Sequence, residues 1–302
     1  MFLPLCIGVV DVESVNNLIN TILKKYNVPP WVVPYAMKYA RRNPLKTIKF
    51  AMSFIETKRK KGAVTSDRVV LPNGLELKLS SLLKVLNATF YEQDMMAKLA
   101  KKWAVSPIGY DTRYMQYANE LSSIEAKHAV AIKNLIEGIG YKVSEPDKHI
   151  NEIFEYISTL DTWPKRLVAI NIVLRDSYAK AFGLILYKVF YSVSPEYMRA
   201  FGKVFSSSES LSQWGFEEAK RTIQEKQMPE SEIIEITRNI ETRVLKTIDF
   251  NMKIAKEAGI EEEVKLLRDI AIVYPFQTLK ELGVDINPGK ELELVKKLAK
   301  KK

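Results

Sequence analysis

The 302-residue sequence has a single cysteine, Cys6, and only two histidines, His128 and His149. One cysteine excludes an intrachain disulfide framework, and no histidine lies near Cys6 in the sequence to support thiol catalysis. Glycine is scarce, with 12 residues, and no glycine-rich phosphate loop or nucleophile-elbow motif is present. These absences exclude the common nucleotide-binding and serine-hydrolase patterns.

Long hydrophobic runs are also missing. No window reaches the roughly 20 apolar residues that a membrane-spanning helix needs. The apolar residues 1–10 lack a basic flank and a clear cleavage site, so they do not form a typical signal peptide. The sequence therefore predicts a protein without a membrane span, located in the cytoplasm.

The composition is that of a chain with a large core. Hydrophobic residues make up 47% and charged residues 27%, with 46 Lys+Arg against 36 Asp+Glu and a net charge of +10. Both signs are interspersed, which favours an ordinary solvated surface over a nucleic-acid or anionic-membrane surface. Abundant Lys, Glu and Ile with few Gln resemble a thermophile composition.

Helical periodicity divides the chain into three parts. Residues 1–79 predict an N-terminal helical arm with a short extended segment, 80–226 a helical bundle, and 227–302 a C-terminal extension of two or three helices. Four long helices are predicted in the middle part, at 81–104, 110–139, 162–191 and 195–226. A connection of about twenty residues with a short helix near 147–158 separates the two helix pairs. The prediction is an all-α protein built on a four-helix bundle with a long crossover.

Each long helix carries a carboxylate on its apolar face. The residues are Glu92 on the first helix, Glu125 with His128 on the second, Asp176 on the third and Glu209 on the fourth. Glu92 and Glu125 are 33 residues apart, as are Asp176 and Glu209, which is the separation that places mid-helix residues of an antiparallel pair side by side. Buried carboxylates repel one another unless protonation or a cation neutralises them. The pattern therefore predicts a metal site, with a metal-free hydrogen-bonded cluster as the alternative.

Together these residues resemble the ferritin-like superfamily of di-iron carboxylate proteins. The resemblance covers about 80–225 and rests on Glu92, the Glu125-Ala126-Lys127-His128 motif, Asp176 and the 208–215 stretch. The segment Trp163-Pro164-Lys165-Arg166-Leu167 is similar to the start of the third helix in multicomponent monooxygenases, phenylacetyl-CoA epoxygenases and ribonucleotide reductase small subunits. The resemblance to the superfamily implies that iron, or alternatively manganese, is held by five ligands: Glu92, Glu125, His128, Asp176 and Glu209.

The chain departs from the family pattern at one ligand. The superfamily has a histidine where this sequence has Ser212, and a hydroxyl is a poor ligand for iron(II). Two irons are expected, or one if the Ser212 subsite is empty. The resemblance implies an oxidoreductase, a hydroxylase or oxidase that activates dioxygen and acts on a hydrophobic substrate, with an electron-donor protein as partner. It also implies a homo-oligomer or a subunit of an oxidative complex.

Two further functions stay open. The first is a degenerate ferritin-like scaffold or interaction protein that binds one metal or none, which the loss of histidine at 212 would suit. The second is nucleic-acid binding through the basic run at 58–61 and the terminal lysines, although no recognised nucleic-acid-binding motif accompanies them. His149, placed among polar residues of the crossover, is predicted to lie at the surface.

Overall fold

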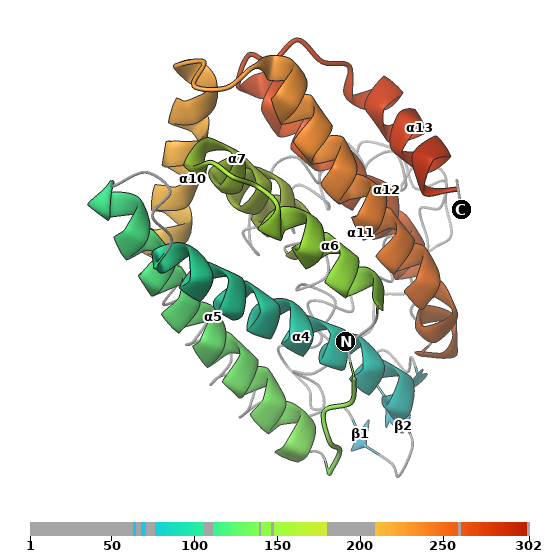
Figure 1. Cartoon of the computed structure of the whole chain (residues 1–302). Coiled ribbons are helices and arrows are strands. Elements are labelled where there is room, and N and C mark those ends of the chain that lie inside the picture. Colours follow the sequence, from blue (N-terminus) through green and yellow to red (C-terminus); the bar gives the residue numbers. More distant parts are fainter. Residues whose placement is uncertain are drawn as a thin grey trace, which may run out of the picture.

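The described part of the chain is almost entirely helical. The computed structural model describes residues 63–64, 68–70, 76–105, 111–138, 140–145, 148–179, 209–258 and 261–300. Figure 1 shows the elements in space: α6 and α7 lie between the α4–α5 pair and the long C-terminal helices α11 and α12. The prediction of an all-α protein is confirmed. The four-helix bundle and the three-part domain division stay predictions.

A small antiparallel sheet precedes the first described helix. Its strands β1 (Ala63–Val64), β2 (Arg68–Val70) and β3 (Glu76–Lys78) are two or three residues long and lie in sequence order. Arg68 and Glu76 form an ion pair of 2.8 Å between β2 and β3. Since β3 continues directly into α4, the sheet fixes where that helix begins. The predicted helices of the N-terminal arm lie outside the described residues.

Helices α4 (Leu79–Ala104) and α5 (Thr112–Gly138) form an antiparallel pair and lie where the sequence predicted the first two long helices. On α4 the buried face includes Leu86, Gln93 and Ala100, spaced seven residues apart, which is two helical turns. The hydroxyl of Ser122 donates to the carbonyl of Ala97 at 2.9 Å and joins the two helices at mid-length. This pair presents the face that carries Glu125 and His128.

The crossover helix α6 (Lys148–Ser158) was also predicted. It is strongly amphipathic and buries Ile150, Ile153, Phe154 and Ile157. The next helix begins as predicted, with Pro164 in the first turn of α7 (Trp163–Leu167), where a proline costs no hydrogen bond.

From Val168 the predicted α-helix differs from the observed one. Residues Val168–Ala179 form η1, a π-helix. The side-chain amide of Asn171 donates to the carbonyl of Leu167 at 3.1 Å. In an α-helix that carbonyl accepts from the backbone N–H of residue 171, so the side chain competes with the regular ladder. The described part of this segment ends at 179, and the rest of the predicted 162–191 helix lies outside it.

The chain then continues with α10 (Glu209–Gln224), the described part of the predicted fourth long helix. Three more helices follow, as expected for the C-terminal extension: α11 (Glu230–Ala258), α12 (Glu261–Glu281) and α13 (Pro288–Ala299). The side chain of Asn287 caps α13 by accepting from the backbone N–H of Lys290 at 3.1 Å. Arg238 of α11 holds α13 through Glu291, with Nη2 to Oε1 at 2.6 Å.

The buried apolar side chains form one continuous core that runs from Leu79 of α4 to Val295 of α13. Its largest fully buried members include Leu121 of α5, Ile157 of α6 and Phe276 of α12. Within the described helices, none is both long and apolar enough to cross a membrane.

Candidate metal centre

The most distinctive polar cluster in the core joins α4 and α5. Glu125 and His128 lie three residues apart on the buried face of α5, with 5% and 2% of their surface exposed. The Nδ1 atom of His128 is 3.1 Å from Oε2 of Glu125 and 3.0 Å from Oε1 of Gln93, a buried residue of α4. An imidazole nitrogen therefore faces two oxygens at hydrogen-bonding distance inside the protein.

The contacts of His128 fix the orientation of its ring. Both oxygens near Nδ1 are acceptors, so a hydrogen on Nδ1 satisfies this geometry. The buried pair thus holds the imidazole in one orientation, with Nδ1 directed at the carboxylate. Fixing the ring in this way is what a histidine needs in order to serve as a ligand or a proton carrier.

Glu92 adds a second carboxylate beside this pair. It is partly buried on α4, next to Gln93 in the sequence. Burial, with a smaller contribution from the negative charge of Glu125, raises the pKa of Glu92 from 4.5 to about 8. At neutral pH the Glu92 carboxyl is therefore mostly protonated, unless a cation offsets the repulsion and the desolvation.

A second buried contact, about two turns before Glu125 along α5, brings η1 and α10 against this helix. The hydroxyl of Tyr117 on α5 donates to Oδ1 of Asn171 on η1 at 2.9 Å, and Gly215 of α10 lies against both side chains. A Cβ atom at Gly215 would lie 2.8 Å from the Tyr117 hydroxyl, so only glycine permits this approach. We call these three residues the Tyr117 junction.

The directions of the helices at the Tyr117 junction bear on the remaining predicted ligands. Aromatic contacts pair Tyr114 with Trp163 and Tyr117 with Trp214, while Tyr114 contacts Glu218. Hence α10 runs antiparallel to α5, and the α7–η1 segment runs in the same direction as α5. Glu125, Asp176 and Glu209 consequently lie on the same side of the junction. They are eight residues from Tyr117, five from Asn171 and six from Gly215 along their own helices.

Of the five predicted ligands, the structure brings Glu125 and His128 of α5 into contact, and Glu92 of α4 lies near enough for the charge of Glu125 to raise its pKa. The backbone of Asp176 lies in η1 and that of Glu209 begins α10, but their side chains fall outside the described residues. Ser212 is partly buried on α10. Among the described side chains, no group of three or more His, Cys, Asp or Glu residues is close enough to hold a metal ion.

Two buried polar residues, Gln93 in the cluster and His149 outside it, differ from the sequence prediction. Gln93 was not predicted as a site residue, although its place in the seven-residue series Leu86, Gln93, Ala100 marks it as a polar residue on the buried face. The surface position predicted for His149 is wrong: its side chain is 15% exposed, lies 3.6 Å from Glu152 and packs against the ring of Phe250. In both cases the contact is with a residue on another helix, His128 for Gln93 and Phe250 for His149. The spacing of residues along a single helix does not predict such contacts.

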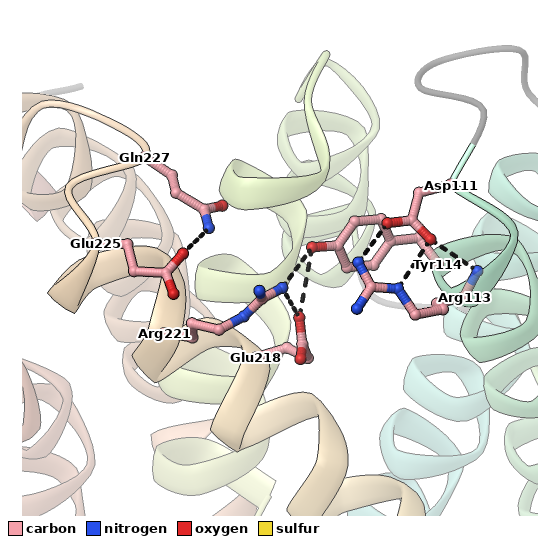
Figure 2. Close-up of polar contacts among 7 residues, drawn as sticks. All are labelled: Asp111, Arg113, Tyr114, Glu218, Arg221, Glu225 and Gln227. Carbon is pink, nitrogen blue, oxygen red and sulfur yellow. Dashed lines mark hydrogen bonds and ion pairs between the residues drawn. The ribbon is translucent and has the colours of Figure 1, made fainter.

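A polar network at the start of α5 fixes the position of α10 (Figure 2). Arg221 donates to Oε2 of Glu218 at 2.6 Å, and the Tyr114 hydroxyl lies 3.4 Å from the same oxygen. Arg113 bonds Asp111 at 2.7 Å on the neighbouring turn, and these hydrogen bonds lower the pKa of Asp111. Burial and the nearby charge of Glu218 raise the pKa of Tyr114. The network holds α10, and with it Ser212, against α5.

A cavity of about 310 Å³ opens between α5 and the first turns of α10. It is lined by Arg113, Gln116, Tyr117, Glu120, Ser210, Leu211 and Trp214. Tyr117, Leu211 and Trp214 give it an apolar wall, and the charged residues lie on α5. The cavity therefore adjoins the Tyr117 junction.

Comparisons with protein-family models, with curated proteins and with solved structures find no match for this chain. The resemblance to the ferritin-like superfamily accordingly rests on the residues of this sequence, and any functional conclusion depends on the geometry described above.

Proposed function

We propose that the protein is a metal-dependent oxidoreductase, a hydroxylase or oxidase of a hydrophobic substrate. Its metal ligands are Glu92, Glu125 and His128, together with Asp176 and Glu209. The observation that carries the proposal is the buried Glu125–His128 pair, in which Nδ1 and Oε2 lie 3.1 Å apart. Both side chains are nearly inaccessible to solvent, and a second carboxylate, Glu92, lies close enough to be affected by the charge of Glu125.

The chemistry of these donors fits iron or manganese. Carboxylate and imidazole ligands suit both metals, and a divalent cation would offset the repulsion between Glu92 and Glu125. Such metals, when bound by carboxylates and imidazole, supply activation of dioxygen. The Tyr117 junction supports the proposal, because the helices that carry Asp176 and Glu209 leave it in the direction of Glu125.

The chain's own residues would provide the surroundings of that chemistry. Leu121 and Ile132 lie one turn before Glu125 and one turn after His128 on the same face of α5, and both are fully buried. They keep water from the pair on either side along the helix. A hydrophobic substrate would approach through the cavity between α5 and α10, along the apolar wall formed by Tyr117, Leu211 and Trp214.

A second candidate function is a scaffold or complex subunit that binds one metal or none. Two observations favour it: the amide oxygen of Gln93 already satisfies Nδ1 of His128, and Ser212 stands where the superfamily has a histidine. If the protein is such a scaffold, protonation of the Glu92 carboxyl would remove its repulsion with Glu125, so that no cation is needed. The predicted oligomer, electron-donor protein and nucleic-acid contact remain separate hypotheses.

Metal content distinguishes the two functions. Protein purified from iron-supplemented cells is expected to contain about two metal ions per chain, the number that ferritin-like carboxylate sites hold. The variants Glu125→Gln and His128→Gln should lose most of that metal. The matched control is Glu137→Gln, which changes a half-exposed carboxylate on the same helix. A folded wild-type protein without metal, and with the same stability in a chelator as in its absence, would support the scaffold instead.

A further inference from the structure

Gln93 supplies a third donor atom to the point where Glu125 and His128 meet. Its Oε1 lies 3.0 Å from Nδ1 of His128, and Oε2 of Glu125 lies 3.1 Å from the same nitrogen. The three donors come from two helices, and Gln93 is 9% exposed. They therefore form one buried set of a nitrogen, a carboxylate oxygen and an amide oxygen.

The distances between these donor atoms match those between neighbouring ligand atoms around an octahedrally coordinated metal ion. First-row divalent metals bind nitrogen and oxygen donors at about 2.1 Å, and two such bonds at a right angle place their donors about 3.0 Å apart. Both observed separations from Nδ1 have this value. An ion bound to Nδ1 on the side that faces the two oxygens would take the place of the hydrogen bonds that now join them.

We propose that Gln93 is a ligand, through Oε1, of the same divalent cation that Glu125 and His128 bind. The inference rests on the proposed function and adds a ligand that the Glu-x-x-His spacing does not contain. One imidazole and two oxygens form a hard set that suits Mn²⁺, Fe²⁺ and Co²⁺ better than soft ions such as Cu⁺. Since the amide is neutral, the three donors bring one negative charge to the ion, and Glu92 is placed to add a second.

The cation to use as a probe is Co²⁺, because its visible absorption reports both binding and donor set. Gln93→Met keeps the length of the side chain and removes the oxygen, whereas Gln93→Glu keeps an oxygen and adds a charge. The control Gln224→Met changes an exposed glutamine at the end of α10. Titration calorimetry should give a Co²⁺ affinity at least about tenfold lower for Gln93→Met, unchanged for the control and higher for Gln93→Glu.

The saturated spectrum separates a ligand from a residue that only orients His128. A ligand role predicts that the visible bands of bound Co²⁺ shift in Gln93→Met even at saturation, whereas an orienting role lowers affinity and leaves the saturated bands in place. Wild-type protein that binds no Co²⁺ would overturn the proposed function. Wild-type binding with an unaltered affinity and spectrum in Gln93→Met would overturn the Gln93 inference alone. If Gln93→Met fails to fold, Gln93→Glu decides: affinity equal to or below that of the wild type contradicts the ligand role.

Discussion

The hydroxyl of Tyr117 and the amide oxygen of Asn171 lie 2.9 Å apart in the core, where side chains of α5 and η1 meet Gly215 of α10. The same asparagine donates its Nδ2 to the carbonyl of Leu167. One side chain of η1 therefore contacts α5 and α10 and bonds the last residue of α7. Such deviations from α-geometry are frequent at functional sites, and Asp176 lies within this one, five residues after Asn171.

Gly215→Ala is expected to destabilise the protein. The added methyl group would lie 2.8 Å from the Tyr117 hydroxyl and would overlap the amide of Asn171. Overpacking of this kind costs about 1–3 kcal/mol, which outweighs the helix propensity gained by replacing glycine. Urea unfolding followed by circular dichroism measures the change.

The matched control for this variant is Gly289→Ala on α13, where the nearest atom to a new Cβ is 3.5 Å away. That substitution should leave stability unchanged or increase it by up to about 1 kcal/mol. In the double variant Gly215→Ala/Asn171→Ala, part of the loss should be recovered because the overlapping amide is gone. Equal stability of Gly215→Ala and the wild type would mean that α10 does not pack closely on Asn171.

The apo protein should become less stable between pH 5 and pH 8. The pKa of Glu92 is about 8 in the folded chain and 4.5 in its ordinary state, so the folded protein binds more protons than the unfolded one in this window. Stability is therefore fully present below about pH 4.5 and is lost as the pH rises through 8. The contribution of this group is about 3 kcal/mol, after allowing for its partial exposure.

Denaturant titrations at several pH values in the presence of a chelator test this dependence. Glu92→Gln should flatten the profile and raise the stability at pH 8, because the amide needs no proton to be buried neutral. Glu137→Gln, on the exposed side of α5, should retain the slope of the wild type. A wild-type profile that is flat over this range would mean that Glu92 is ionised in the folded protein as it is in the unfolded chain.

Arg166→Lys is expected to cost about 1–3 kcal/mol of stability. The guanidinium is buried between two indole rings, 4.8 Å from the centroid of Trp103 and 5.3 Å from that of Trp163, and its Nε donates to the carbonyl of Leu160 at 2.9 Å. Burial lowers the pKa of Arg166, with a partial offset from Asp161. An ammonium group is more strongly hydrated and has no planar face to stack on the rings.

Thermal unfolding and tryptophan emission measure the effect of this exchange. Arg243→Lys is the comparison, because Arg243 stacks on Tyr156 at 4.7 Å in a partly exposed position and should tolerate the change at under about 1 kcal/mol. Similar losses in the two variants would indicate that burying Arg166 between the two rings adds little to the cost of replacing arginine by lysine.

The sequence predicted the helices well because helical periodicity and terminal signals are local. Pro164 and the apolar series of α4, α5 and α6 mark helices that the structure has within a few residues. The site was predicted only in part, since Glu125 and His128 share one helix whereas the contact to Gln93 depends on the rotation of α4 against α5. The π-helix at 168–179 was not predictable from periodicity either, since residues 168–174 are all buried and leave no exposed face to set a helical period.

Ser212→His tests whether the missing histidine limits metal binding. Ser212 is partly buried on α10, three residues after Glu209, so a histidine there would restore the Glu-x-x-His spacing on a second helix. An imidazole is a far better donor to iron(II) than a hydroxyl. We expect the metal content to rise by about one ion per chain relative to the wild type, or the second ion to bind more tightly if two are already present. Elemental analysis and calorimetry with Mn²⁺ or Co²⁺ measure the change.

Ser210→His adds the same side chain at an exposed position of α10 and should leave the metal content unchanged. If both variants gain metal equally, the new histidines bind at the surface and Ser212 does not face the site; if neither gains any, the loss of histidine at 212 is not what limits the second ion.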